Sequence, residues 1–353
     1  MCNRFTMLWR VGFLFLFVIF PNDTYQKLQR QSINLKFLEL LPNHMTDQFL
    51  GSLFNSSLAN VMKIADRFKF CTADKEALKF LVFRNDKMDP SELYLSSNDL
   101  DMRIPTKILI HGWYGTGDNE FIKRLANQYH KKGRYNVIGV DWSNHSKRDY
   151  VSSSCSTRDI GKVITEFILT LIGGDLRLLP NIHLIGHSLG AQVAAFAGKS
   201  MKSRTKRNIG RITGLDAAAP LFEFPFKVPK HLRLNAEDAE YVDGIHTNMG
   251  FFGFASAFGT SDFFVENGSP IQPGCNTNNF FEDLVCSHGR SVDLFLESIT
   301  SKKLIGQECP NPFVFRIGLC SNRKRAVMGE EISKDVTGNY FLDTYDKPPY
   351  GKG

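Results

Sequence analysis

The stretch Ile182-His-Leu-Ile-Gly-His-Ser-Leu-Gly190 has the form Gly-x-Ser-x-Gly and joins two apolar segments of different periodicity. Ile182–Ile185 is typical of a buried strand, and Leu189–Met201 is typical of a helix. In this strand–turn–helix setting the glycines allow close approach of the two elements, and the turn lifts Ser188 clear of the sheet. The pattern predicts a nucleophile at Ser188; the alternative is an ordinary turn between a strand and a helix.

Strands and helices alternate on both sides of this turn. Short β-rich apolar runs predict strands, and stripes with a period near 3.6 predict helices. Such alternation favours an α/β fold with a mostly parallel central sheet and helices on both faces. The predicted strands are 78–83, 107–110, 136–140, 182–185 and 209–215; the predicted helices follow Asp118 and cover 160–172, 189–201 and 288–299.

The composition is that of an ordinary globular protein. Of 353 residues, 42% are apolar and 22% are charged, which excludes disorder, collagen and coiled coil as the main state. The net charge is +7, but there is no dense Lys/Arg block with interleaved aromatic residues, so we predict no nucleic-acid partner.

The N-terminus indicates secretion. Arg4 and Arg10 precede an apolar run over 11–20 that is too short to span a bilayer. We predict a signal peptide over residues 1–20, an N-terminal extension or prosegment over 21–70, and one catalytic domain over 71–353. An uncut membrane anchor is the alternative to an extracellular protein.

Cysteine and asparagine patterns agree with secretion. Cys2 falls in the predicted signal, which leaves six cysteines, enough for three disulfides with fifteen connectivities. No pair has the C-x-x-C spacing of a zinc site, and we predict no bound metal. The six cysteines are Cys71, Cys155, Cys275, Cys286, Cys309 and Cys320, and sequons that permit glycosylation start at Asn22, Asn55, Asn144 and Asn267.

A serine nucleophile needs a base, and the base needs an orienting carboxylate. Asp216 directly follows a predicted strand, and His288 follows Cys286-Ser287. Serine, acid and histidine then occur in the chain order of α/β-hydrolases. The alternatives are a turn carboxylate for Asp216 and a helix cap for His288. Of the other histidines, His246 is interpreted as a core or supporting group, and His183 lies in a predicted buried strand. His187 lies in the turn at Ser188, and His231 lies in a basic loop.

An oxyanion hole is expected beside the nucleophile. His111-Gly112-Trp113 follows the strand 107–110, which is where the oxyanion loop of this fold lies. We predict that the backbone N–H groups of Trp113 and Leu189 hold the oxyanion.

These residues resemble the secreted pancreatic lipase family of α/β-hydrolases, in particular its insect lipase and phospholipase A1 branch. The resemblance covers about residues 70–353 and implies the same three catalytic residues. It also implies the pairings Cys71–Cys155, Cys275–Cys286 and Cys309–Cys320. In a departure from the vertebrate lipases, we expect no C-terminal β-sandwich domain. The matching stretches are 107–113, 140–142, 183–190, 213–216, 233–234 with 245–247, and 286–288.

Two departures from the family bear on the metal and on the acid. The family has Asp-Pro-Ala where this chain has Asp216-Ala217-Ala218. The calcium loop of the vertebrate members aligns with Lys230–Asp238, but Asn235 replaces one acidic ligand. Because a hard cation site weakens when it loses a charged oxygen, we expect no required cofactor and little dependence on calcium.

The loops expected to cover the site are short. Cys275 and Cys286 enclose only residues 276–285, and the segment between Thr247 and Asp262 is also short. In the family that these residues resemble, triglyceride lipases have long versions of both loops and phospholipases A1 have short ones. The expected lid residues are Cys275, Phe280, Phe281, Leu284, Val285 and Cys286, and the expected apolar rim is Phe251, Phe252, Phe254 and Phe258. The four apolar lid side chains are candidates for contact with lipid, and the alternative for each is ordinary packing of the loop.

The sequence therefore predicts a secreted lipid carboxylic-ester hydrolase of phospholipase A1 type, which acts at a membrane or lipid-particle surface. The alternatives are a triacylglycerol lipase and a non-catalytic lipid-binding or yolk-type protein on the same fold. Non-catalytic relatives typically lose the nucleophile, whereas the three predicted catalytic residues are intact here.

Overall fold

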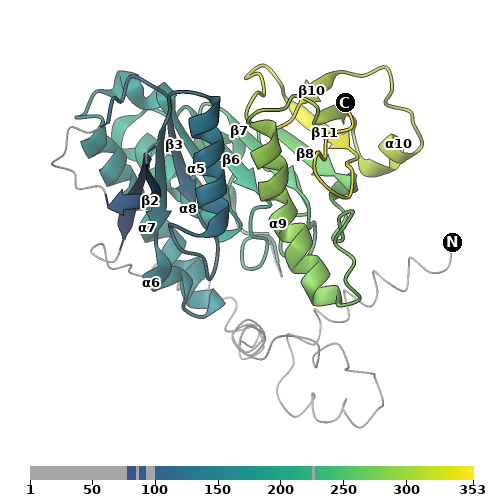
Figure 1. The fold of residues 1–353 in the computed structure, drawn as a ribbon, viewed down its shortest axis with the longest axis horizontal. Coiled ribbons are helices and arrows are strands. Elements are labelled where there is room, and N and C mark those ends of the chain that lie inside the picture. The colour runs from purple at the N-terminus through teal and green to yellow at the C-terminus, as the bar shows by residue number, and fades with distance from the viewer. Residues whose placement is uncertain (1–77, 85–86, 93–99, 225–226) are drawn as a thin grey trace, which may run out of the picture.

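The computed structural model describes residues 78–84, 87–92, 100–224 and 227–353 (Figure 1). In this part of the chain eleven strands form one sheet in the order β10-β9-β11-β8-β7-β6-β5-β3-β4-β1-β2. The strands are β1 (Lys79–Arg84), β2 (Lys87–Glu92), β3 (Thr106–Ile110), β4 (Asn136–Asp141), β5 (Ile182–His187), β6 (Arg211–Leu215), β7 (Val242–His246), β8 (Ser261–Val265), β9 (Ile305–Glu308), β10 (Arg325–Val327) and β11 (Gly338–Leu342).

The sheet is parallel in its centre and antiparallel at both edges. The run from β11 through β8, β7, β6, β5 and β3 to β4 is parallel, whereas β1, β2, β9 and β10 pair antiparallel. The five predicted strands are confirmed. β2 was not predicted because it contains Pro90. Proline has no backbone N–H to donate, so a sheet tolerates it mainly in an edge strand such as β2.

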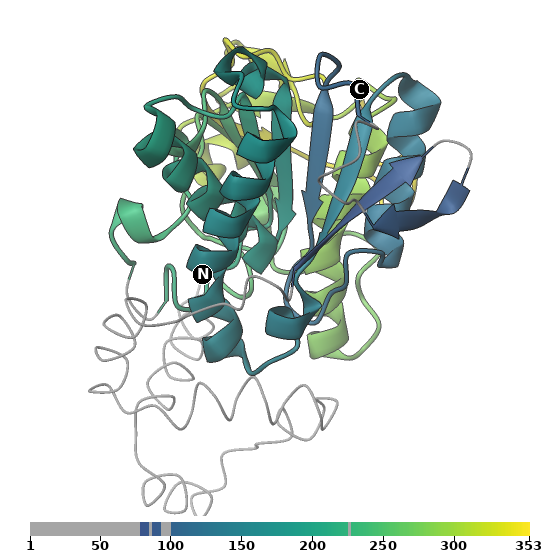
Figure 2. The same ribbon diagram turned by 90° about the vertical axis from the view of Figure 1, so that its left-hand side faces the viewer.

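Helices cover both faces of the sheet, as predicted. α7 and α8 pack together on one face, and α5 and α9 lie on the other (Figure 2). The described helices are α5 (Glu120–Lys132), α6 (Ser143–Ser146), α7 (Tyr150–Leu171), α8 (Leu189–Thr205), α9 (Phe280–Ser298) and α10 (Pro312–Arg316). None of the helices in the described ranges has the length and apolar content needed to cross a membrane.

The central strands bury side chains on both faces. In β3, Ile108 and Ile110 contribute to the core under α7 and α8, and Leu109 between them contributes to the core under α5 and α9. All five residues of β3 are buried. Burial on both faces explains why the parallel strands are continuous apolar runs in the sequence.

α7 begins ten residues before the apolar stripe that predicted it. Asp149 caps its N-terminus by accepting a hydrogen bond from the Ser152 backbone N–H at 3.0 Å. The first turns are buried through small polar side chains, such as Ser153, whose hydroxyl donates to the His145 carbonyl at 2.8 Å. Because these hydroxyls bond to backbone carbonyls, the helix is buried without an apolar pattern.

A buried ionic network ties the C-terminal region to the sheet. Arg211 on β6 forms two hydrogen bonds to Asp243 on β7, at 2.8 and 2.9 Å. Glu330 forms an ion pair with Lys107 on β3 and accepts a hydrogen bond from the Tyr129 hydroxyl at 2.6 Å. The side chains of Lys107 and Glu330 are each 7% exposed, so the loss of either charge would leave the other uncompensated.

We expect Glu330→Gln to lower the free energy of unfolding by about 3–5 kcal/mol, because it leaves Lys107 buried without a carboxylate. The matched control is Glu331→Gln at the next position, where Lys132 and Lys302 form exposed ion pairs and the cost should be about 1 kcal/mol or less. Denaturant unfolding of the three proteins measures both values. Equal losses for the two variants would contradict a buried network.

The predicted signal peptide over 1–20 and the predicted extension over 21–70 lie outside the described residues, so their assignments stay predictions. The same is true of Cys71, Asn22 and Asn55.

Candidate active site

Ser188 sits in a strained turn between β5 and α8. Its backbone has φ 56° and ψ −123°, a conformation that residues with a side chain rarely adopt. The turn depends on both neighbouring glycines: a Cβ on Gly186 would lie 2.3 Å from the Gly190 carbonyl oxygen, and a Cβ on Gly190 would lie 2.2 Å from the Ile110 carbonyl oxygen. The close packing of β5 and α8 agrees with the sequence pattern, and the structure adds the contact of Gly190 with β3.

Asp216 follows β6 and is completely buried. One carboxylate oxygen accepts hydrogen bonds from the backbone N–H groups of Thr247 and Asn248, at 2.8 and 3.0 Å. The other oxygen accepts a hydrogen bond of 2.6 Å from His288 Nδ1. Gly253 closes over this carboxylate, because a Cβ there would lie 2.3 Å from Asp216 Oδ1. Sequence reasoning missed Asn248 and Gly253, which carry no local signal of their role.

His288 lies in the middle of α9 rather than at the start of a helix as predicted. α9 begins at Phe280, where Asn279 caps it by accepting from the Phe281 backbone N–H at 3.1 Å. The donation from Nδ1 to Asp216 leaves Nε2 of His288 available as an acceptor. Phe252 lies 5.5 Å from the His288 ring, centroid to centroid, in an edge-on arrangement.

Ser188 lies in the same region as Asp216 and His288. Within the described part of the chain, Ser188 Oγ and His288 Nε2 do not form a hydrogen bond. Ser188 is linked to the Asp216 loop by the Ala218 N–H, which donates to the Ser188 carbonyl at 3.2 Å. His187 contacts His288, with ring centroids 4.5 Å apart and its Nε2 donating to the His288 carbonyl at 3.2 Å. Burial lowers the pKa of His187 to about 3, so it is a neutral neighbour of His288.

The predicted oxyanion loop lies against the nucleophile. A Cβ on Gly112 would lie 2.9 Å from Ser188 Cβ, and Leu189 is the first residue of α8. His111 is buried behind the loop, where its Nδ1 donates to the Gly112 carbonyl at 2.9 Å and its Nε2 accepts from the Trp142 backbone N–H at 3.3 Å. The geometry is compatible with an oxyanion held by the N–H groups of Trp113 and Leu189, which stays a prediction.

A buried histidine–aspartate pair lies next to this site. His246 Nε2 donates to Asp262 Oδ1 at 2.7 Å, and His246 Nδ1 donates to the Phe254 carbonyl at 3.1 Å. Burial favours the neutral ring, but the hydrogen bond and charge of Asp262 outweigh burial and raise the pKa of His246. Because both ring nitrogens face oxygen acceptors, the surroundings favour the imidazolium form of His246, which lies directly before Thr247.

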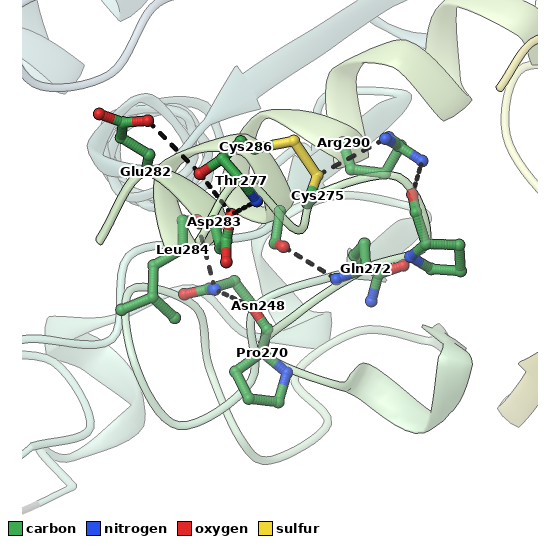
Figure 3. The surroundings of a disulfide bond; sticks show 12 residues. Asn248, Pro270, Gln272, Cys275, Thr277, Glu282, Asp283, Leu284, Cys286 and Arg290 are labelled. Atoms are coloured by element: carbon green, nitrogen blue, oxygen red, sulfur yellow. Dashed lines mark hydrogen bonds between the residues drawn. A yellow bond between two sulfur atoms is a disulfide. The ribbon is translucent and has the colours of Figure 1, made fainter. Parts of the chain in front are cut away.

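The predicted lid loop is mostly helical. Residues 280–285 belong to the first turns of α9, so only 276–279 link this helix to Cys275. Figure 3 shows Asn248 between Pro270 and Leu284. Its side-chain amide donates hydrogen bonds to the backbone carbonyls of both residues. Thr277 donates to Asp283 at 2.6 and 2.9 Å through its N–H and hydroxyl groups.

Part of the predicted lipid-facing surface is instead core. Leu284 is 3% exposed, whereas Val285 is 45% exposed. Phe254 and Phe258 of the expected rim are buried, because they belong to the hydrophobic core under α7 and α8. Phe251, Phe252, Phe280 and Phe281 are half-buried and form two edge-on pairs, Phe251 with Phe280 and Phe252 with Phe281.

Two of the three disulfide pairings are confirmed: Cys275–Cys286 and Cys309–Cys320, with Cα–Cα distances of 5.7 and 5.6 Å. Cys155 is disulfide-bonded, and its expected partner Cys71 is outside the described residues. Of the sequons, Asn144 is exposed and Asn267 is half-buried.

The sequence matches the family model Lipase over residues 55–350, and the chain belongs to this family. It is 30% identical to pancreatic lipase-related protein 2 of Cavia porcellus over 69% of this chain and 56% of that protein. It is 34% identical to hepatic triacylglycerol lipase of Mus musculus (70% and 52%) and 35% identical to lipoprotein lipase of Neovison vison (69% and 56%). The chain therefore spans about half the length of these curated relatives.

We expect the stability contributed by His246 to fall as the pH rises. Because the folded pKa of His246 is raised, this contribution is fully present below the unfolded value of about 6.5 and is lost as the pH rises through the folded pKa. The free energy of unfolding of the wild type and of His246→Gln, measured from about pH 5.5 to 9, should differ less at high pH. The control is His231→Gln at an exposed histidine, where the difference should stay small throughout. A difference for His246→Gln that is constant with pH would refute the buried imidazolium.

Proposed function

We propose that this protein is a serine carboxylic-ester hydrolase in which Ser188 is the nucleophile, His288 the base and Asp216 the orienting acid. The observation that carries the proposal is the 2.6 Å bond between Asp216 and His288 beside a serine at φ 56°. A strained turn of this kind costs folding free energy of order 1–3 kcal/mol. Its retention next to a buried histidine–carboxylate pair supports a chemical role for Ser188.

In the proposed reaction His288 Nε2 removes the proton of Ser188 as Oγ attacks the ester carbonyl. The oxyanion is held by the backbone N–H groups of Trp113 and Leu189, and Asp216 stabilises the imidazolium. The imidazolium then protonates the leaving alkoxide, and the acyl-enzyme forms. Water activated by His288 hydrolyses the acyl-enzyme and restores Ser188.

We expect Ser188→Ala to lower kcat by roughly a millionfold while the protein folds and is secreted as before. The serine side chain has little packing role, so thermal unfolding should be nearly unchanged. Hydrolysis of a short soluble ester measures the loss. A residual rate near that of the wild type would show that another residue is the nucleophile.

The substrate we propose is a phospholipid, with release of the sn-1 fatty acid by a secreted enzyme. The segment between Cys275 and Cys286 consists of a four-residue link and the first turns of α9, and a disulfide joins its two ends. Such a segment can neither cover a wide mouth nor swing open to add apolar surface for a triglyceride. A small cover leaves room for a bulky polar head group.

A lipid surface as the partner is supported by exposed apolar side chains beside cationic ones. Phe313, Ile317 and Leu319 are 69, 52 and 71% exposed within the loop closed by Cys309–Cys320. Exposed basic side chains lie in and after this loop, which suits an anionic surface. They are Arg316, Arg323, Lys324 and Arg325.

The alternative substrate is a triglyceride, and the name of the relative hepatic triacylglycerol lipase favours it. A non-catalytic lipid-binding role is the alternative from another class. It is disfavoured because the predicted catalytic residues are all retained and Asp216 and His288 are hydrogen-bonded.

We expect the purified protein to hydrolyse phosphatidylcholine faster than emulsified triolein, with sn-1 acyl chains as the product. Little jump in rate should appear as the substrate passes its aggregation limit, since the lid is too short to be displaced. The Ser188→Ala protein is the blank for both assays. Faster hydrolysis of triolein would establish the triglyceride alternative, and no hydrolysis of either by the folded protein would favour lipid binding alone.

A further inference from the structure

The segment 230–238 encloses the ammonium group of Lys199, which comes from the middle of α8. Lys199 Nζ contacts both carboxylate oxygens of Asp238 at 2.5 Å and donates to the Arg233 carbonyl at 2.8 Å. The Asp238 side chain is 3% exposed, and that of Lys199 is 19% exposed. The ammonium therefore has three oxygen partners from one short segment, in largely buried surroundings.

The oxygens of this segment do not fit calcium. The carboxylate of Asp238 is also bonded by two N–H donors of Asn235, its backbone N–H at 3.0 Å and its side-chain amide at 3.1 Å. The Asn235 side-chain oxygen instead accepts from the Glu237 N–H, as the cap of the short helix η5 (Ala236–Asp238). Calcium needs six to eight oxygens facing it, whereas here nitrogen donors face Asp238. Among the described residues no group of three or more His, Cys, Asp or Glu is placed to hold a metal.

Segment 230–238 is also connected to the candidate active site. The Leu234 N–H donates to the Gln192 side-chain oxygen at 2.9 Å, and the Gln192 amide donates to the Ala218 carbonyl at 3.0 Å. Gln192 lies four residues after Ser188 on α8, and Ala218 lies two residues after Asp216. The contact with α8 is close, because a Cβ on Gly198 would lie 2.0 Å from the Asp238 carbonyl oxygen.

We propose that Lys199 is an internal cation that takes the place of a metal ion in segment 230–238 and, through Gln192, positions the Ser188 and Asp216 loops. In this role Lys199 is a positioning residue, since it touches no reacting atom, and the positioning step rests on the proposed hydrolase function. Burial raises the pKa of Asp238 to about 6 and lowers the pKa of Lys199. The direct contact between the two groups opposes this effect of burial, so each supplies the counter-charge of the other within the protein.

The first test compares stability with and without the cation. In the wild type, neither EDTA nor millimolar calcium should change Tm. Lys199→Met keeps the apolar stem but removes the charge, and it should lower Tm by roughly 5–10 °C. Lys202→Ala is the control from the next turn of α8, where the lysine is exposed and donates to the Glu237 carbonyl at 3.3 Å; its Tm should stay close to that of the wild type.

The second test rebuilds a metal site. The double variant Lys199→Met with Asn235→Asp adds an acidic ligand and removes the ammonium, so calcium but not magnesium should raise its Tm by several degrees through selective binding to the folded state. Secretion of this variant into calcium-containing medium provides a folded protein if Lys199→Met alone does not fold. A calcium-dependent Tm in the wild type, or no calcium response in the double variant, would overturn the internal-cation assignment.

The positioning role has its own readout. On a short soluble ester, Lys199→Met should lower kcat by about tenfold with KM little changed, because the groups around the reacting atoms are displaced while the acyl-binding surface is not. Calcium should restore kcat in the double variant. An unchanged kcat in a protein with lowered Tm would overturn positioning but leave the internal cation standing. Since Tm is measured without a substrate, failure of the hydrolase proposal and failure of the internal cation are distinguishable.

Discussion

The close approach of β3, β5 and α8 around Ser188 is the constraint on which the site depends. Gly186 and Gly190 are present because a Cβ at either would overlap backbone atoms within about 2.3 Å. Their absence of side chains lets α8 begin directly beside the sheet with Ser188 in a left-handed conformation. Asp216 and the expected oxyanion loop are placed relative to this turn by β6 and β3, which run parallel to β5, whereas His288 comes from α9.

Parallel strands bring their carboxyl ends to one edge, and that is where the acid and the oxyanion loop lie. Asp216 follows β6, the Thr247 and Asn248 amides follow β7, and Gly112 follows β3. The buried carboxylate is held by two backbone donors and one histidine. These hydrogen bonds hold the carboxylate in place and fix the ring of His288 in one orientation.

Three cations of the described residues are buried or largely buried against a carboxylate. Lys107 and Arg211, in β3 and β6, pair with Glu330 and Asp243, and Lys199 in α8 pairs with Asp238. A charge that is buried with its partner costs little more than an apolar pair, but a charge that loses its partner is costly. The ionic pairs therefore connect segments far apart in the sequence in a way that tolerates little substitution.

The sequence by itself determined the class of fold and the turn at Ser188, because these depend on local periodicity and glycine placement. It also singled out Asp216 and His288 as candidates, and the family resemblance implied the two disulfides that the structure contains. Only the tertiary structure revealed the roles of Asn248 and Gly253, which act by meeting Asp216 from another loop. It also extended α7 and α9 beyond their apolar stripes, since capping and hydroxyl-to-backbone bonds lie outside hydrophobic periodicity. The surroundings of Lys199 are likewise visible only in the structure. Its ammonium group is largely buried because segment 230–238 packs against α8 and supplies its oxygen partners.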